Sequence, residues 1–128
     1  MPPKPRDRRP PVAIGHVFFK ATNVAAAAGW FETVGLRPIA SGEDFAVLEL
    51  RGGTHLIVTR AARRPKRGAE APFDLMVDDV AASRRAFAAK GLGPSRIRRG
   101  SIHDSFALSG PGGARFTVLS SHAGRRPV

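Results

Sequence analysis

The feature that most restricts the fold of this chain is an internal repeat. An Asn-Val…Phe…Gly-Leu pattern at residues 23–36 recurs as Asp-Val…Phe…Gly-Leu at residues 79–92, with identical spacing. Each copy has apolar residues at helical spacing and begins with a side chain that caps free helical N–H groups. Each copy also ends at a glycine, Gly35 or Gly91, which suits the left-handed residue that closes a helix. A repeat of this length predicts two equivalent structural units, each with one helix.

Strand-like segments surround both predicted helices. One precedes each helix and three follow it, the last opened by a Gly-Gly pair. In chain order these segments cover residues 12–20, 38–41, 45–51, 52–58, 71–77, 95–99, 102–109 and 112–118. The order strand, helix, three strands thus occurs twice, which predicts an α+β fold of two βαβββ modules.

The chain divides into one folded domain with a basic arm at each end. Residues 1–11 are rich in proline and arginine and are predicted to be a disordered head, and residues 122–128 are predicted to be a flexible tail. The domain between them, residues 12–121, consists of module one (12–59), a basic linker (60–70) and module two (71–121). The linker lacks any apolar pattern, as expected of a connection between modules.

The strongly positive charge leaves several classes of partner open. Lysine and arginine number 21 against 10 acidic residues, which gives a net charge of +11. Such a balance permits binding of nucleic acid or of smaller anions. The arginines are not interleaved with aromatic residues, so a nucleic-acid interface is the less favoured interpretation.

Cysteine is absent, which excludes disulfides, thiolate metal sites and cysteine nucleophiles. The sequence has no apolar run near the roughly 20 residues that span a bilayer. The head also lacks the apolar core of a secretory signal, so we expect a cytoplasmic protein.

Three segments carry a resemblance to a known family. IGHVFFKATNVAAAAGWFETVGL and FDLMVDDVAASRRAFAAKGL resemble the openings of the two modules of the vicinal oxygen chelate superfamily, and FALSGPGGARFTVL resembles its closing hairpin. This superfamily includes glyoxalases, bleomycin resistance proteins and extradiol dioxygenases. Gly110 stands where the family usually has aspartate. The resemblance covers about residues 12–121 and implies a cup-shaped mixed sheet with helices outside, often in a homodimer.

Alternation along the strands, read with this resemblance, assigns side chains to the cup. The predicted ligand-binding residues are His16, Phe18, Lys20, His55, Ile57, Asp74, Met76, His103, Arg115 and Thr117. The metal-ligand positions of the family correspond to His16, Ile57, Pro72 and Thr117. Only the first of these is a good donor for a divalent ion, so no metal and no other cofactor is predicted. Neither the residues nor the resemblance assigns a catalytic group.

Three functions follow as hypotheses. The first is a metal-independent small-molecule-binding protein whose cup favours an anionic ligand, because Lys20 and Arg115 are expected to face it. The second is a metal-dependent lyase, isomerase or dioxygenase that would use a displaced set of ligands, His16 with His55 and His103. The third is a nucleic-acid-associated protein acting through its basic arms. A small-molecule ligand and a second copy of the chain are the expected partners, and no membrane is expected.

Overall fold

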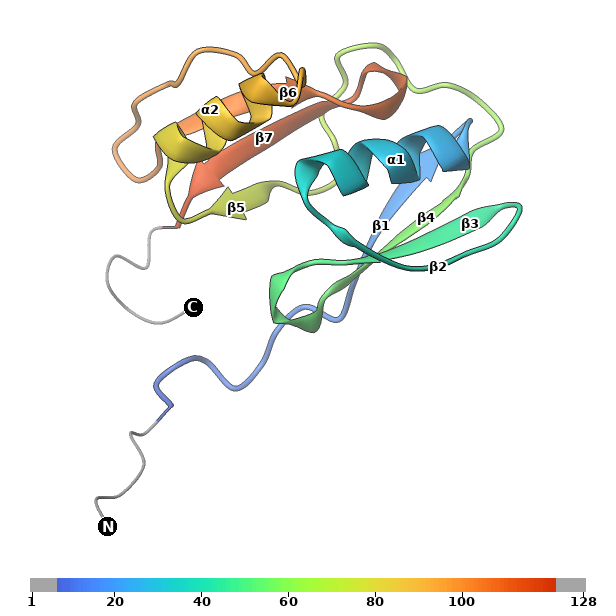
Figure 1. Ribbon diagram of the computed structural model, residues 1–128, viewed down its shortest axis with the longest axis horizontal. Helices are drawn as coiled ribbons and strands as arrows, with labels where there is room; N and C mark the ends of the chain where they lie inside the picture. The colour runs from blue at the N-terminus through green and yellow to red at the C-terminus, as the bar shows by residue number, and fades with distance from the viewer. Residues whose placement is uncertain (1–6, 122–128) are drawn as a thin grey trace.

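The computed structural model describes residues 7–121; residues 1–6 of the predicted head and the whole predicted tail, residues 122–128, lie outside the described residues. Two short 3-10 helices, η1 and η2, cover Arg51–Gly53 and Pro111–Gly113. The first half of the chain contains β1 His16–Ala21, α1 Val24–Val34, β2 Arg37–Ser41, β3 Phe45–Glu49 and β4 His55–Arg60 (Figure 1). The second half contains β5 Leu75–Val77, α2 Val80–Ala89, β6 Ser105–Ser109 and β7 Arg115–Ser120. No helix among residues 7–121 is long and apolar enough to cross a bilayer.

Both helices begin where their capping side chains predict. The Asn23 side chain accepts a hydrogen bond from the Ala26 N–H at 3.0 Å, and the Asp79 side chain accepts one from the Ala82 N–H at 2.9 Å. At the other end of α1, Gly35 has a φ of 130°, a conformation that strongly favours glycine. Helix α2 ends slightly earlier than its repeat partner, because its last residue is Ala89 and Lys90 forms the C-cap.

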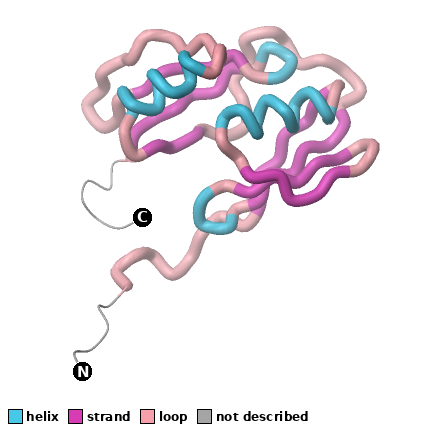
Figure 2. Tube along the Cα trace, in the orientation of Figure 1, coloured by secondary structure: helices cyan, strands magenta, loops and turns pink. Residues whose placement is uncertain are grey.

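The two halves share one strand topology. The first sheet has the order β1-β4-β3-β2 and the second has the order β5-β7-β6 (Figure 2). In each half the strand before the helix pairs in parallel with the last strand, which pairs antiparallel with the strand before it. The predicted α+β fold and its repeat are therefore confirmed. Of the weak strand at residues 95–99, only an isolated bridge between Arg98 and Ser105 forms, so the second sheet has three strands.

Five predicted strands begin three or four residues later than expected, and the Gly-Gly pairs expected to open the last strand of each module lie in η1 and η2 instead. The first strand begins at His16, and Val12, predicted within it, is 80% exposed. The strand predicted from residue 71 begins only at Leu75. Pro72 lies outside it, since proline has no N–H to donate to a neighbouring strand. Ile102, predicted to open the strand at residues 102–109, is 67% exposed in the loop before β6. Apolar alternation predicts which face is buried, but a strand extends only as far as its partner strand pairs with it.

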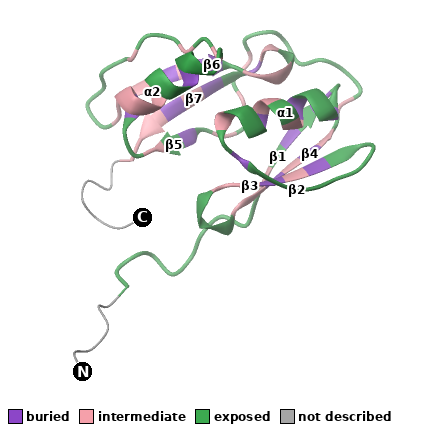
Figure 3. Ribbon diagram, viewed as in Figure 1, coloured by how far each residue is buried: buried purple, intermediate pink, exposed green. Residues whose placement is uncertain are grey.

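The core lies between the sheets and the helices, which cover the same side of both sheets (Figure 3). Leu56 and Val58 of β4 are fully buried there, and so are Phe116 and Val118 of β7. In both last strands the face toward the helices is therefore the buried one. Rings from the two halves also meet, because Phe116 of module two lies 5.5 Å from Phe31 of α1, between centroids. The modules therefore share one hydrophobic core.

Candidate ligand-binding site

The face of each sheet that points away from the helices is the candidate site, and we call it the cup face. In β1, Phe19 is buried and its ring lies 5.4 Å from that of Phe31 in α1. Its neighbours in the strand point the other way, so His16, Phe18 and Lys20 lie exposed on the cup face. The side chain of Phe18 is 59% exposed, which is unusual for a phenylalanine in a strand.

A row of polar side chains crosses this face from one edge of the first sheet to the other. His16 of β1 is paired with His55 of β4, which is paired with Glu49 of β3, which is paired with Arg37 of β2. The imidazole rings of His16 and His55 are nearly parallel, with centroids 6.2 Å apart. His55 Nε2 lies 3.1 Å from Glu49 Oε2, and the Arg37 guanidinium pairs with the other Glu49 oxygen.

This row of side chains fixes the orientation of the His55 ring and leaves the His16 ring accessible to a ligand. Glu49 binds one nitrogen of the His55 ring, and it is itself held by Arg37. A carboxylate in this position sets the orientation of the ring. His16 is exposed beside it, so its ring nitrogens are accessible to a ligand on the cup face.

Glu49 and Arg37 were not predicted from the sequence as site residues. Glu49 has the same strand phase as Phe45 and Val47, so alternation alone places it on the cup face of β3. What the sequence does not show is the register that sets Glu49 against His55. Arg37 follows the helix directly and has no comparable signal, because β2 is exposed along its whole length.

Of the ten predicted site residues, five come together on the first sheet. The register sets His16 against His55 and Phe18 against Ile57, and Lys20 follows at the end of β1. The other five belong to module two. Met76 of β5 and Thr117 of β7 lie on the face of the second sheet that points away from the helices, and Asp74 is exposed just before β5.

Two predicted residues of module two already have protein partners. Arg115 at the start of β7 lies 3.5 Å from the carboxylate of Glu70. His103 lies in the loop before β6, with Nδ1 2.6 Å from the carbonyl oxygen of Ser120. His103 is thus held at the end of the second sheet, whereas His16 and His55 are neighbours on the first.

The metal that the family resemblance implies does not fit the donor set of this chain. Of the four corresponding positions, Ile57 and Pro72 offer no side-chain donor, and the Thr117 hydroxyl is a poor one. The displaced set proposed as an alternative is split between the two sheets, because His103 lies apart from the other two histidines. Among residues 7–121, no three His, Asp or Glu side chains converge in a way that could hold a metal ion.

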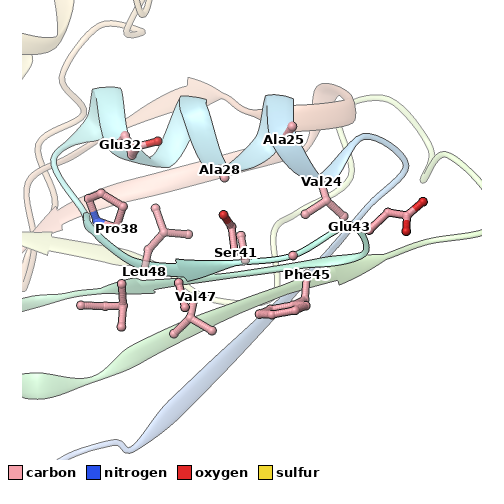
Figure 4. Close-up of a pocket in the computed structure, with 14 residues that line it drawn as sticks. Val24, Ala25, Ala28, Glu32, Pro38, Ser41, Glu43, Phe45, Val47 and Leu48 are labelled. Atoms are coloured by element: carbon pink, nitrogen blue, oxygen red, sulfur yellow. The ribbon is translucent and has the colours of Figure 1, made fainter.

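A separate pocket of about 390 Å³ opens on the helix side of the first sheet. It lies between α1 and the hairpin formed by β2 and β3, and we call it the α1–hairpin pocket (Figure 4). Ala25, Ala28 and Glu32 line it from the helix, and Ser41 and Leu48 line it from the hairpin. No sequence pattern indicates this pocket, because the pocket depends on the distance between the helix and an edge hairpin.

Comparison with known proteins identifies the fold. No protein-family model and no curated protein matches the chain. Among solved structures, a lactoylglutathione lyase from Agrobacterium tumefaciens is similar with a TM-score of 0.70 and 19% identity, over 89% of this chain and 97% of that one.

Two further similar structures are described as glyoxalase/bleomycin resistance protein/dioxygenase. The one from Alicyclobacillus acidocaldarius has a TM-score of 0.70 and 16% identity, over 94% of this chain and 99% of that one. The one from Nocardioides has the same TM-score and identity, over 94% of this chain and 89% of that one. These likenesses are to the fold, and the chain has the fold of the glyoxalase, bleomycin resistance and dioxygenase proteins of the vicinal oxygen chelate superfamily.

Proposed function

We propose that this chain is a cytoplasmic, metal-independent small-molecule-binding protein of the glyoxalase/bleomycin-resistance type, which holds an anionic ligand on its cup face. The observation that carries the proposal is the contiguous group on the first sheet. There the register sets the exposed ring of Phe18 against Ile57, next to the paired His16 and His55. Small-molecule sites combine apolar walls with a few polar groups in this way.

The charges of the cup face support an anionic ligand. Lys20 lies exposed at the end of β1, and among residues 7–121 its ammonium group has no ion-pair partner. Arg115 lies on the corresponding face of the second sheet, and its one carboxylate partner, Glu70, is itself largely exposed. Glu49 is the carboxylate of the histidine row, and Arg37 offsets its charge.

The cup is also proposed to be completed by a second copy of the chain. One chain carries two separate sheets, and each exposes a large apolar side chain on its cup face, Phe18 on the first and Met76 on the second. A twofold axis that sets the first sheet of each copy against the second sheet of the other would cover both side chains at once. Such an isologous contact closes on itself, as most homodimers do.

Titration with anilinonaphthalene sulfonate, an anionic aromatic dye, tests the binding proposal. We expect saturable fluorescence enhancement, with a Kd that is unchanged by chelator or by added zinc, nickel or manganese. Phe18→Ser should weaken the affinity by roughly tenfold or more, because burying a phenylalanine is worth about 1.5–3 kcal/mol.

The matched control is Ile102→Ser. Ile102 is an exposed apolar residue of comparable size, 67% exposed, but it lies in the loop before β6, outside both sheets. This variant should bind the dye like the unmodified protein. Equal losses in both variants would show general adhesion to apolar surface, and loss of binding with chelator would favour the metal-dependent alternative.

A further inference from the structure

The α1–hairpin pocket exists because small side chains face each other across it. Helix α1 presents Ala25 and Ala28 toward the hairpin, which presents Ala40, Ser41 and Gly42 in return. These residues leave a gap of about 390 Å³, which lies within the range of about 300–1,000 Å³ typical of small-molecule sites. The pocket lies on the helix side of the first sheet, so it is distinct from the cup face.

The charges around this pocket differ from those of the whole molecule. The chain has 21 lysines and arginines against 10 acidic residues, yet the only charged residues that line the pocket are Glu32 and Glu43. Figure 4 shows Glu32 toward the C-terminal end of α1 and Glu43 at the opposite end, beside the turn of the hairpin. The side chains that line the pocket between them are apolar except for that of Ser41.

Both carboxylates lack the partners that most others have. Six acidic side chains pair with a basic residue: Asp7, Asp44, Glu49, Glu70, Asp78 and Asp104. Among residues 7–121, the side chains of Glu32 and Glu43 have neither an ion pair nor a hydrogen bond. Even Asp44, adjacent to Glu43 in the chain, binds Arg60 at 3.0 Å. In so basic a protein, two unpaired carboxylates at the ends of one apolar pocket indicate a positively charged occupant.

We propose that the α1–hairpin pocket binds a compact organic cation, an ammonium group attached to an apolar body. The apolar body packs between the alanines of α1 and the hairpin, and the ammonium group pairs with Glu32 or Glu43. The site takes a ligand of the opposite charge to the one proposed for the cup face. Either binding proposal can therefore be correct without the other.

The experiment is a titration of the nitrogen-15-labelled full-length protein with phenethylammonium, followed by amide NMR shifts. Saturable shifts are expected at Ala28 and Ser41 in the pocket and not at Phe18 or Ile57 on the cup face. Glu32→Gln and Glu43→Gln should each weaken binding by up to about fivefold, since exposed ion pairs contribute up to about 1 kcal/mol. Added salt should weaken binding in the unmodified protein.

Three controls complete the test. Glu70→Gln removes an exposed carboxylate outside the pocket and should leave the affinity unchanged. Phenylethanol, the neutral counterpart of the probe, should bind more weakly by about the factor that the double glutamine variant loses. Ala25→Leu fills the pocket from an exposed helix position and should abolish the shifts while dye binding on the cup face persists.

Four results would overturn the proposal: no saturable shifts, equal affinity for phenylethanol, unchanged affinity in the double glutamine variant, or shifts confined to the cup face. Because the glutamine substitutions lie at exposed positions, they test the proposal even if Ala25→Leu fails to fold.

Discussion

At the scale of single residues, Gly110 explains a departure from the family pattern. A Cβ added at this position would lie 2.6 Å from Cε2 of Phe116, whose ring is fully buried. The aspartate that the family usually has here would meet the same ring. The buried ring of Phe116 therefore favours glycine at position 110 in the preceding turn.

Gly110→Ala is expected to lower the free energy of unfolding by about 1–3 kcal/mol, the usual cost of overpacking. Chemical denaturation measures the change. The control is Gly29→Ala in α1, where an added Cβ meets no atom within 4 Å. That variant should be more stable by about 0.5–1 kcal/mol, because alanine is favoured over glycine inside a helix. An unchanged stability in Gly110→Ala would show that the Phe116 ring has room to move.

The two equivalent phenylalanines of the repeat should differ in their contribution to stability. Phe31 is fully buried, and its ring contacts aromatic rings from both modules: Phe19, Trp30, Phe73 and Phe116. Phe87 is 8% exposed, and its ring contacts that of Phe106 within its own module. We expect Phe31→Ala to cost about 3–5 kcal/mol and Phe87→Ala to cost less. Equal costs in denaturation experiments would mean that the rings shared between modules add little.

At the scale of elements, the head should be dispensable for folding. Its described ion pair is local: the Asp7 side chain accepts hydrogen bonds from Arg9, which lower the pKa of Asp7 to about 2. The first bonds to the sheet involve Ile14 and Gly15, whose carbonyl oxygens accept from the Thr54 hydroxyl and the His55 N–H.

Deletion of residues 1–10 should therefore leave the melting temperature nearly unchanged, as scanning calorimetry would show. A fall of more than about 5 °C, equivalent to roughly 1 kcal/mol in a domain of this size, would show that the head packs on the body.

The elements also show how far the sequence predicts the structure. Capping residues and periodicity correctly placed both helices, because these signals are local, and the repeat correctly predicted the shared topology. Strand ends were less accurate, as for Val12 and Ile102, because pairing depends on a distant strand. The partnership of Glu49 with His55 likewise required the register between β3 and β4.

At the scale of the whole molecule, the modules should be held together by packing more than by charge. An ion pair joins them, between Arg51 in η1 and Asp78 before α2 at 2.9 Å, but both side chains are more than half exposed. Exposed pairs contribute about 0–1 kcal/mol, so Arg51→Gln should change stability little. The rings around Phe116 are buried between the modules instead.

The proposed dimer predicts an oligomeric state and a way to disrupt it. Sedimentation equilibrium should give twice the mass of the chain. Phe18→Asp should shift the protein toward monomer, because the second sheet of the other copy would bury the introduced charge. Ile102→Asp changes an exposed apolar residue in the loop before β6, outside both sheets, and should remain dimeric. A monomeric unmodified protein at high concentration would contradict the arrangement.

The most direct test of metal-independent binding on the cup face is the crystal structure of protein purified from cells without chelator. The account predicts no metal ion, and electron density for an organic anion that contacts Phe18 and Ile57 and accepts a hydrogen bond from His16. A divalent ion bound by His16 and a second histidine at about 2.0–2.3 Å would contradict it and favour the metal-dependent enzyme.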